Sequence, residues 1–136
     1  MTAQNWISIA AILSAVIAYL AKNFVLEPLL ELRKVRGRIQ NRLKYHSNII
    51  TNGEFPADVI RPIREELRQL SCDLEEAYFA MGLRRWFPTF LKIPTGEDVS
   101  EAARQLIFLS NSTGNSRHIM QNDEAMNKIK EKLRII

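Results

Sequence analysis

The feature that most constrains this chain is an uncharged N-terminal segment. Residues 2–21 carry no charged side chain, and the last 16 of these 20 residues are nearly all apolar. A helix needs about 20 apolar residues to cross the ~30 Å hydrocarbon core of a bilayer. We extend the span through residues 24–26, because the long side chain of Lys22 reaches back to the headgroups. The sequence therefore predicts a transmembrane anchor over residues 1–26.

Two other interpretations of this segment are open. A cleaved signal peptide would end near Val16-Ile17-Ala18, but residues 1–5 lack the basic region with which such peptides begin. A buried core helix that is apolar on all sides would need a larger protein to cover it. Trp6 and Tyr19 lie near the two ends of the segment, where amphipathic aromatic rings favour the membrane interface. We therefore predict the anchor.

Charge is distributed unevenly along the rest of the chain. Residues 22–50 contain seven basic and two acidic residues, net +5, whereas residues 51–136 contain twelve basic and thirteen acidic ones, net −1. Lys and Arg are enriched on the cytoplasmic flanks of membrane spans. We expect a single pass through the inner (plasma) membrane, with a short N-terminus outside and the C-terminal domain in the cytoplasm.

The basic run beside the span predicts contact with anionic lipid headgroups, to which each Lys or Arg near the surface contributes about 1 kcal/mol. The residues expected to make these contacts are Lys22, Arg33, Lys34, Arg36 and Arg38. Nucleic-acid binding is the rival interpretation of a basic chain. No recognition motif or aromatic stacking platform accompanies the run, so we do not expect nucleic acid as a partner.

Beyond the span, apolar residues recur at a spacing near 3.6 and no segment alternates strictly, which predicts helices. The expected helices cover residues 29–50, 57–81, 97–110 and 118–134. Asn52-Gly53 is a typical break between two of them. Pro28 sits in a first turn or kinks a helix that continues from the membrane, and Pro62 is expected to mark a first turn. The predicted fold class is all-α: an N-terminal transmembrane helix, then an up-and-down bundle of about four helices over residues 27–136.

Small residues follow one side of the expected span at a spacing of four. They are Ala10, Ser14 and Ala18, and beside them Ala11 and Ala15. This spacing lets two helix backbones approach closely, and a serine hydrogen bond adds to their van der Waals contact in lipid. We expect a homo-oligomer with this stripe as its seam and Lys22 at the cytoplasmic edge. The alternative is that alanine and serine are simply common in spans.

The connection over residues 83–94 is the densest aromatic and basic stretch of the chain. Its expected interfacial residues are Arg84, Arg85, Trp86, Phe87, Phe90 and Lys92. Such a composition is typical of a segment at a membrane surface. The alternative is a loop folded over the end of the bundle, with its aromatic rings covering the core.

Residues that suggest catalysis are few. His46 lies on an apolar stripe, where a histidine is more often a core residue than a base, and Cys72 is expected to be buried. No metal-ligand or phosphate-loop motif is present, so we expect no metal and no cofactor. Arg42-Leu-Lys-Tyr-His46 is similar to the Arg-to-His motif of helical-bundle ribonucleases from toxin and antiviral systems. It has three intervening residues instead of four to six, and we do not adopt a nuclease function.

The layout resembles uncharacterised small bacterial membrane proteins that have one N-terminal span and a helical cytoplasmic domain. We expect a non-enzymatic, membrane-anchored protein whose helical domain mediates self-association or recruits a protein partner at the inner leaflet. The alternative is an oligomeric pore-forming or membrane-disrupting effector of a bacterial conflict system, antiviral or toxin-like.

Overall fold

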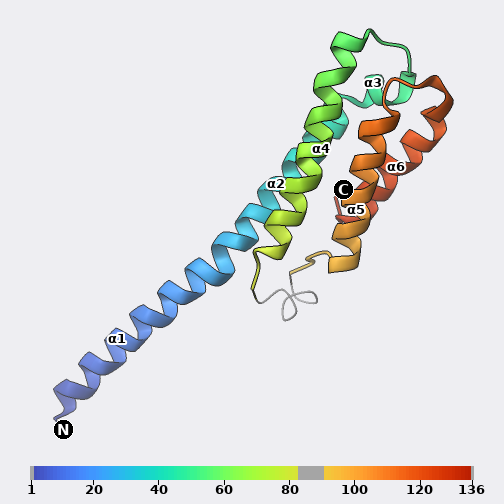
Figure 1. Cartoon of the computed structure of the whole chain (residues 1–136). Helices are drawn as coiled ribbons and strands as arrows, with labels where there is room; N and C mark the ends of the chain where they lie inside the picture. Colours follow the sequence, from blue (N-terminus) through green and yellow to red (C-terminus); the bar gives the residue numbers. More distant parts are fainter. Residues whose placement is uncertain (1, 83–90, 136) are drawn as a thin grey trace.

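The computed structural model describes residues 2–82 and 91–135, and no strand occurs in these two ranges. The elements are α1 (Ala3–Ala21), η1 (Lys22–Leu26), α2 (Glu27–Tyr45), α3 (Ser47–Asn52), α4 (Ala57–Phe79), α5 (Gly96–Ser112), η2 (Ser116–His118) and α6 (Ile119–Lys132). Each segment expected to be helical has a helical counterpart (Figure 1). The predicted all-α fold class, with a long apolar helix at the N-terminus, is confirmed.

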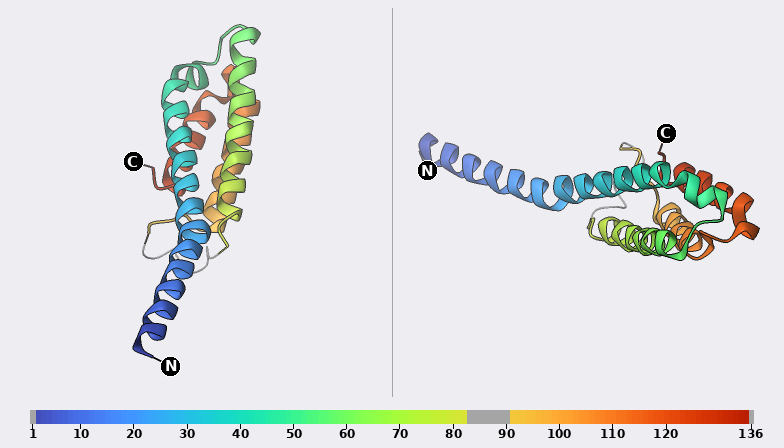
Figure 2. Two further views of the ribbon diagram at one scale, coloured as in Figure 1. Left: turned by 90° about the vertical axis from the view of Figure 1, so that its left-hand side faces the viewer. Right: turned by 90° about the horizontal axis from the view of Figure 1, so that it is seen from above.

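One continuous helical rod runs from Ala3 to Tyr45 through α1, η1 and α2. Its middle section, η1, is a π-helical turn in which the N–H of Glu27 bonds five residues back, to the carbonyl of Lys22. The widened turn coincides with Pro28, which has no N–H for the carbonyl one turn before it. The rod changes direction at this junction (Figure 2). Pro28 therefore kinks a helix that continues from the N-terminal segment, which is one of its two expected roles.

The core of the domain lies between α2, α4, α5 and α6. α4 packs against both α2 and α5, and α6 packs against α5 (Figures 1 and 2). The apolar stripes that the 3.6-residue spacing predicts over 29–50, 57–81 and 97–110 face the core, as Leu32, Leu67 and Leu106 show. The largest fully buried side chains include Leu32, Ile39, Leu43, Leu67, Leu74, Leu106, Leu109, Ile129 and Leu133. Since each such side chain contributes about 1.5–3 kcal/mol on burial, this stripe-to-stripe packing is the main stabilising term of the domain.

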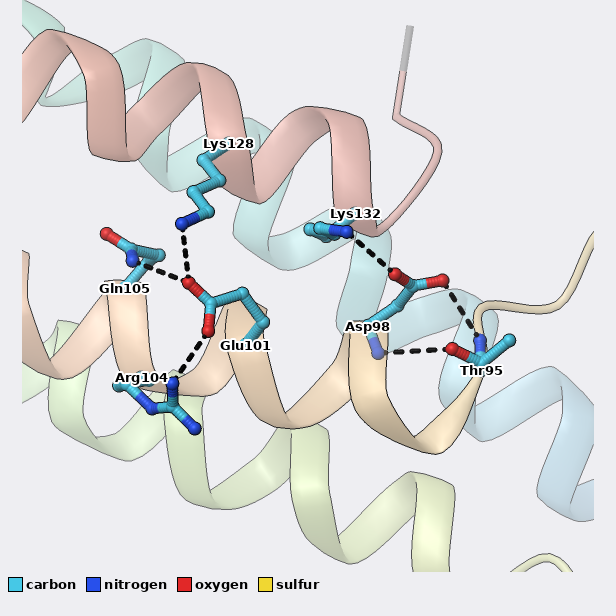
Figure 3. A network of polar contacts seen from close by, with 7 residues as sticks. All are labelled: Thr95, Asp98, Glu101, Arg104, Gln105, Lys128 and Lys132. Carbon is cyan, nitrogen blue, oxygen red and sulfur yellow. Dashed lines mark hydrogen bonds and ion pairs between the residues drawn. The ribbon is translucent and has the colours of Figure 1, made fainter.

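Polar contacts fasten α6 to α5 beside the core. α5 begins with a capping box, in which Thr95 and Asp98 each accept a hydrogen bond from the backbone N–H of the other, at 3.2 and 3.4 Å. The same Asp98 carboxylate lies 3.2 Å from Lys132 of α6, and Glu101 lies 2.8 Å from Lys128 (Figure 3). The two carboxylates thus stand one helical turn apart and each holds a lysine of α6.

A buried asparagine connects α6 to α3 and α5. Asn122 is fully buried, donates a hydrogen bond to the backbone carbonyl of Ile50 at 2.8 Å and accepts one from the hydroxyl of Ser112. α3 ends at Gly53, which has a φ of 72°. A Cβ at this glycine would lie 2.9 Å from the Cα of Ser116, so the turn needs glycine on two grounds. The predicted Asn52-Gly53 break is confirmed.

Three local predictions are wrong. Pro62 lies inside α4, which begins at Ala57, so the helix continues through a proline that lacks one intrahelical N–H. The helix expected over 29–50 is interrupted at His46, whose backbone is not helical. Cys72 is exposed, because the buried stripe of α4 passes through its neighbour Ser71 instead.

Candidate functional site

α1 protrudes from the domain, and none of its 19 residues is buried (Figure 1). The five small residues of the expected seam lie on one side of this helix by its 3.6-residue repeat: Ala10, Ala11, Ser14, Ala15 and Ala18. The opposite side carries large apolar residues: Ile9, Ile12, Leu13, Val16 and Leu20. The helix therefore presents a smooth face and a bulky face, both uncovered by the domain.

The serine hydroxyl groups of α1 bond within the helix itself. Ser14 donates to the carbonyl of Ala10 at 2.7 Å, and Ser8 donates to the carbonyl of Gln4 at 3.1 Å. These bonds satisfy the two serine donors without a second copy of the chain. Association along this face would therefore depend on close packing of the alanines rather than on a serine hydrogen bond between helices.

The structure divides the expected headgroup residues of α2 between two faces. On one face, Lys34 lies 3.4 Å from Glu31, and Arg38 lies 3.1 Å from Asp73 of α4. On the other face, Arg33 and Arg36 line a groove together with the segment that follows α6. In the described part of the chain, neither of these two arginines has an ion pair with an acidic side chain. The positive charge of α2 is thus neutralised on one face and left unopposed on the other.

Two more residues that were predicted to contact lipid lie in the described part of the chain, Lys22 and Lys92. Lys22 is the first residue of η1 and is exposed at the end of α1. Lys92 is also exposed and lies at the same groove as Arg33. Its predicted companions in the interfacial segment, Arg84, Arg85, Trp86, Phe87 and Phe90, lie outside the described residues. The end of α4 and the start of α5 lie at the end of the domain from which α1 emerges (Figures 1 and 2).

A second polar cluster lies in a groove between α2 and α4. The Glu66 carboxylate forms an ion pair with Nε of Arg42 at 2.8 Å and lies 2.9 Å from Nε2 of His46. His46 is 9% exposed, and its Nδ1 is buried without a hydrogen-bond partner. Because Arg42 and His46 are one turn apart, both reach the same carboxylate on α4. The cluster therefore acts as a tie between α2 and α4, and it leaves Glu66 engaged rather than available as a base.

Arg134 and Glu66 are residues that the sequence reasoning missed. Each meets its partner across a large sequence separation, 98 residues for Arg36 with Arg134 and 20 for His46 with Glu66. For Glu66 a pattern was available, because Arg42 and His46 are four residues apart and so share one side of a helix. For Arg134 no local pattern exists.

Residues 2–82 and 91–135 contain no group of three or more His, Cys, Asp or Glu side chains placed to hold a metal ion. No protein-family model, curated protein or solved structure matches the chain. The resemblance to small bacterial single-span proteins stays an expectation, and the function is argued below from the chain's own residues.

Proposed function

We propose that residues 1–26 anchor the chain in the inner membrane and that residues 27–136 form a cytoplasmic domain that self-associates or recruits a protein partner. The observation that carries this proposal is that α1 is apolar and exposed. It is long and apolar enough to cross a membrane, and none of its residues is covered by the domain. Ile7, Ile12 and Ile17 are 70%, 65% and 65% exposed. A lipid bilayer removes such side chains from water, at about 25 cal/mol per Å² of apolar surface.

The proposed orientation rests on the flanks of the helix. Residues 1–5 contain no Lys or Arg, whereas Lys22 follows α1 directly and further basic residues follow on α2. This difference in basic residues favours a cytoplasmic domain and a short N-terminus on the other side. The lipid headgroups at the inner leaflet then become the first partner of the basic residues.

We assign to the domain an up-and-down bundle built from α2, α4, α5 and α6. The packing of α2 with α4, of α4 with α5 and of α5 with α6 supports this arrangement, because successive helices of an up-and-down bundle are neighbours. Self-association is supported by the smooth face of α1, formed by its small residues.

Extraction of isolated membranes with alkaline carbonate tests the anchor. The full chain should stay in the membrane pellet. The double variant Leu13→Arg with Val16→Arg should move to the supernatant, because each arginine near the centre of a span costs about 2.5–3.5 kcal/mol on insertion. The matched control places two arginines on exposed positions of α6, Glu124→Arg with Asn127→Arg, and should stay in the pellet. Release of the full wild-type chain by carbonate would overturn the proposal.

A potential-sensitive dye separates this proposal from the pore-forming alternative. Cells that express the chain strongly should keep their membrane potential, because an anchored binding domain opens no path for ions. Depolarisation that depends on expression level would favour the pore.

A further inference from the structure

A groove beside α2 gathers positive charge from three parts of the chain. Arg33 and Arg36 come from α2, Lys92 from the segment before α5, and Arg134 from the segment after α6. The described residues that line this groove include no Asp or Glu. The remaining lining residues are mostly apolar and include Leu29, Leu32, Leu91 and Ile135. We call this the basic groove; its four cations have no acidic side chain among them.

Arg36 lines the basic groove and is partly buried, and most of its donors have no hydrogen-bond partner among the described residues. Its Nη2 donates to the backbone carbonyl of Arg134 at 3.1 Å, and its Nε is buried without a hydrogen-bond partner in residues 2–82 and 91–135. A guanidinium carries five N–H donors in a planar fork, so several remain free. Burial lowers the pKa of Arg36 below its ordinary value, and the charges of Arg134 and Arg33 lower it further. The group remains protonated near neutral pH, so the fold holds three repelling arginines close together.

The backbone on both sides of the groove adopts a conformation that long side chains rarely take. Arg134 has a φ of 53° at the end of α6, where the N–H groups of Arg134 and Ile135 bond to the carbonyls of Glu131 and Lys130 at 3.0 and 2.8 Å. This hydrogen-bond pattern is a Schellman motif, in which glycine is the usual residue at the left-handed position. Lys92 has a φ of 50°. Two strained positions of the described chain thus each place a cation at the same groove.

We propose that the basic groove binds a phosphate group, held by Arg36 and Arg33 with Lys92 and Arg134 on either side. A phosphate offers several acceptor oxygens and a negative charge, and the planar fork of arginine binds two of those oxygens at once. The apolar residues of the same groove suit a ligand whose phosphate is joined to an apolar part. Binding would relieve the repulsion among the arginines and supply acceptors for the free donors of Arg36.

The phosphate has two sources, an anionic lipid headgroup and a soluble phosphate compound. Arg33 lies seven residues beyond Leu26, about 10 Å along the helix, so its side chain can reach headgroups if the anchor lies in the membrane. The lipid source therefore rests on the proposed function. The phosphate chemistry does not rest on it, since the groove is built by the domain itself.

The test measures thermal unfolding of the full chain with added inorganic phosphate, with chloride at equal ionic strength as reference. The protein is reconstituted in phosphatidylcholine bilayers, in which phosphate should raise the unfolding temperature. The double variant Arg36→Gln with Arg134→Gln should bind phosphate at least about tenfold more weakly, because it removes two charged hydrogen-bond donors. The matched control is Lys44→Gln with Arg61→Gln, which removes two positive charges at exposed positions that do not line the groove and should respond like wild type.

Phosphatidate in the bilayer distinguishes the two sources. If the lipid phosphate occupies the basic groove, wild-type chain in bilayers containing phosphatidate should no longer respond to inorganic phosphate, and native mass spectrometry should find phosphatidate retained on wild type but not on the groove variant. An unchanged response to inorganic phosphate assigns the site to a soluble ligand. Should the groove variant not fold, Lys92→Gln, at an exposed position, repeats the comparison.

The proposal is overturned if neither phosphate nor phosphatidate affects wild type, or if the groove variant and the control variant lose binding alike. The second result would assign any effect to diffuse positive charge. These outcomes are independent of the carbonate extraction. A chain released by carbonate can still bind inorganic phosphate in the groove, and an anchored chain can fail to do so.

Discussion

Asp98 and Glu101 are the residues through which acid should weaken the packing of α6 on α5. For Asp98, burial raises the pKa, but hydrogen bonds from Lys132 and Thr95 outweigh it and hold the pKa below the ordinary value of 3.8. For Glu101, the hydrogen bonds from Lys128 and Gln105 hold the pKa below 4.5. A carboxylate with a depressed pKa in the folded state stabilises the protein above its unfolded pKa. This contribution is therefore complete above about pH 4.5 and is lost as the pH falls through the folded values.

Denaturant unfolding at about pH 7 and about pH 3 checks this prediction. The double variant Asp98→Asn with Glu101→Gln should be less stable than wild type at the higher pH. Its free energy of unfolding should also fall less than that of wild type between the higher and the lower pH. Both carboxylates remain partly exposed to solvent, so added salt should reduce the difference. Glu124→Gln, which removes an exposed carboxylate of α6 that forms no ion pair in the described structure, should leave the pH dependence as it is. An unchanged profile in the double variant would contradict the assignment.

Replacing each of two glycines by alanine should change the stability of the protein in opposite directions. Gly114 has a φ of 85°, and a Cβ there would lie 2.3 Å from Cδ1 of the buried Ile60. Gly114→Ala should therefore destabilise the protein by about 2 kcal/mol, from the left-handed backbone and the displaced side chain together. Gly37 lies inside α2 with nothing within 4 Å of its Cβ position. Gly37→Ala should stabilise by about 0.5–1 kcal/mol, because it lowers the entropy of the unfolded chain. Chemical denaturation measures the free energy of unfolding of both variants. A change of the same sign in both would refute the prediction.

At the scale of helices, local sequence was sufficient to locate the elements but not their partners. The segment expected over 97–110 is observed as α5 from Gly96 to Ser112, because the apolar repeat and the turn residues around it are encoded within the segment. Whether a lysine or arginine is paired depends on residues far along the chain. Arg38 meets Asp73 only because α4 packs on α2, and Arg36 meets Arg134 across 98 residues. The division of the basic run into a neutralised and an unopposed face was therefore beyond any local pattern.

For a buried polar group, too, the local sequence predicts its position but not its hydrogen-bond partner. Asn122 occupies the apolar stripe of α6 four residues before Met126, so its burial could have been predicted from spacing. Its hydrogen bond to the carbonyl of Ile50 could not, because that carbonyl lies in the last turn of α3, 72 residues before Asn122. Periodicity identifies which residues are covered, and the tertiary arrangement decides what a covered polar group bonds to.

The smooth face of α1 leads to a prediction about association of the element as a whole. Ala11→Leu with Ala15→Leu adds bulk to that face and should weaken association by about tenfold, because the helix backbones can no longer approach closely. Ile9→Leu with Ile12→Leu changes the shape of the bulky face while keeping its size and should have no effect. Analytical ultracentrifugation in mild detergent compares the two. A wild-type chain that sediments as a monomer at all concentrations would rule the seam out.

At the scale of the whole molecule, the exposed cysteine provides a direct measure of orientation. Cys72 is the single cysteine of the chain, lies on the exposed side of α4 and belongs to the domain proposed to be cytoplasmic. A maleimide that does not cross membranes should leave Cys72 unlabelled in spheroplasts and should label it once the membrane is opened. In the background Cys72→Ser, the variant Thr2→Cys should give the reverse result, labelling in intact spheroplasts, because residue 2 precedes α1. The two sites lie on opposite sides of one span under the proposed topology, so equal accessibility of both would show that α1 does not cross the membrane.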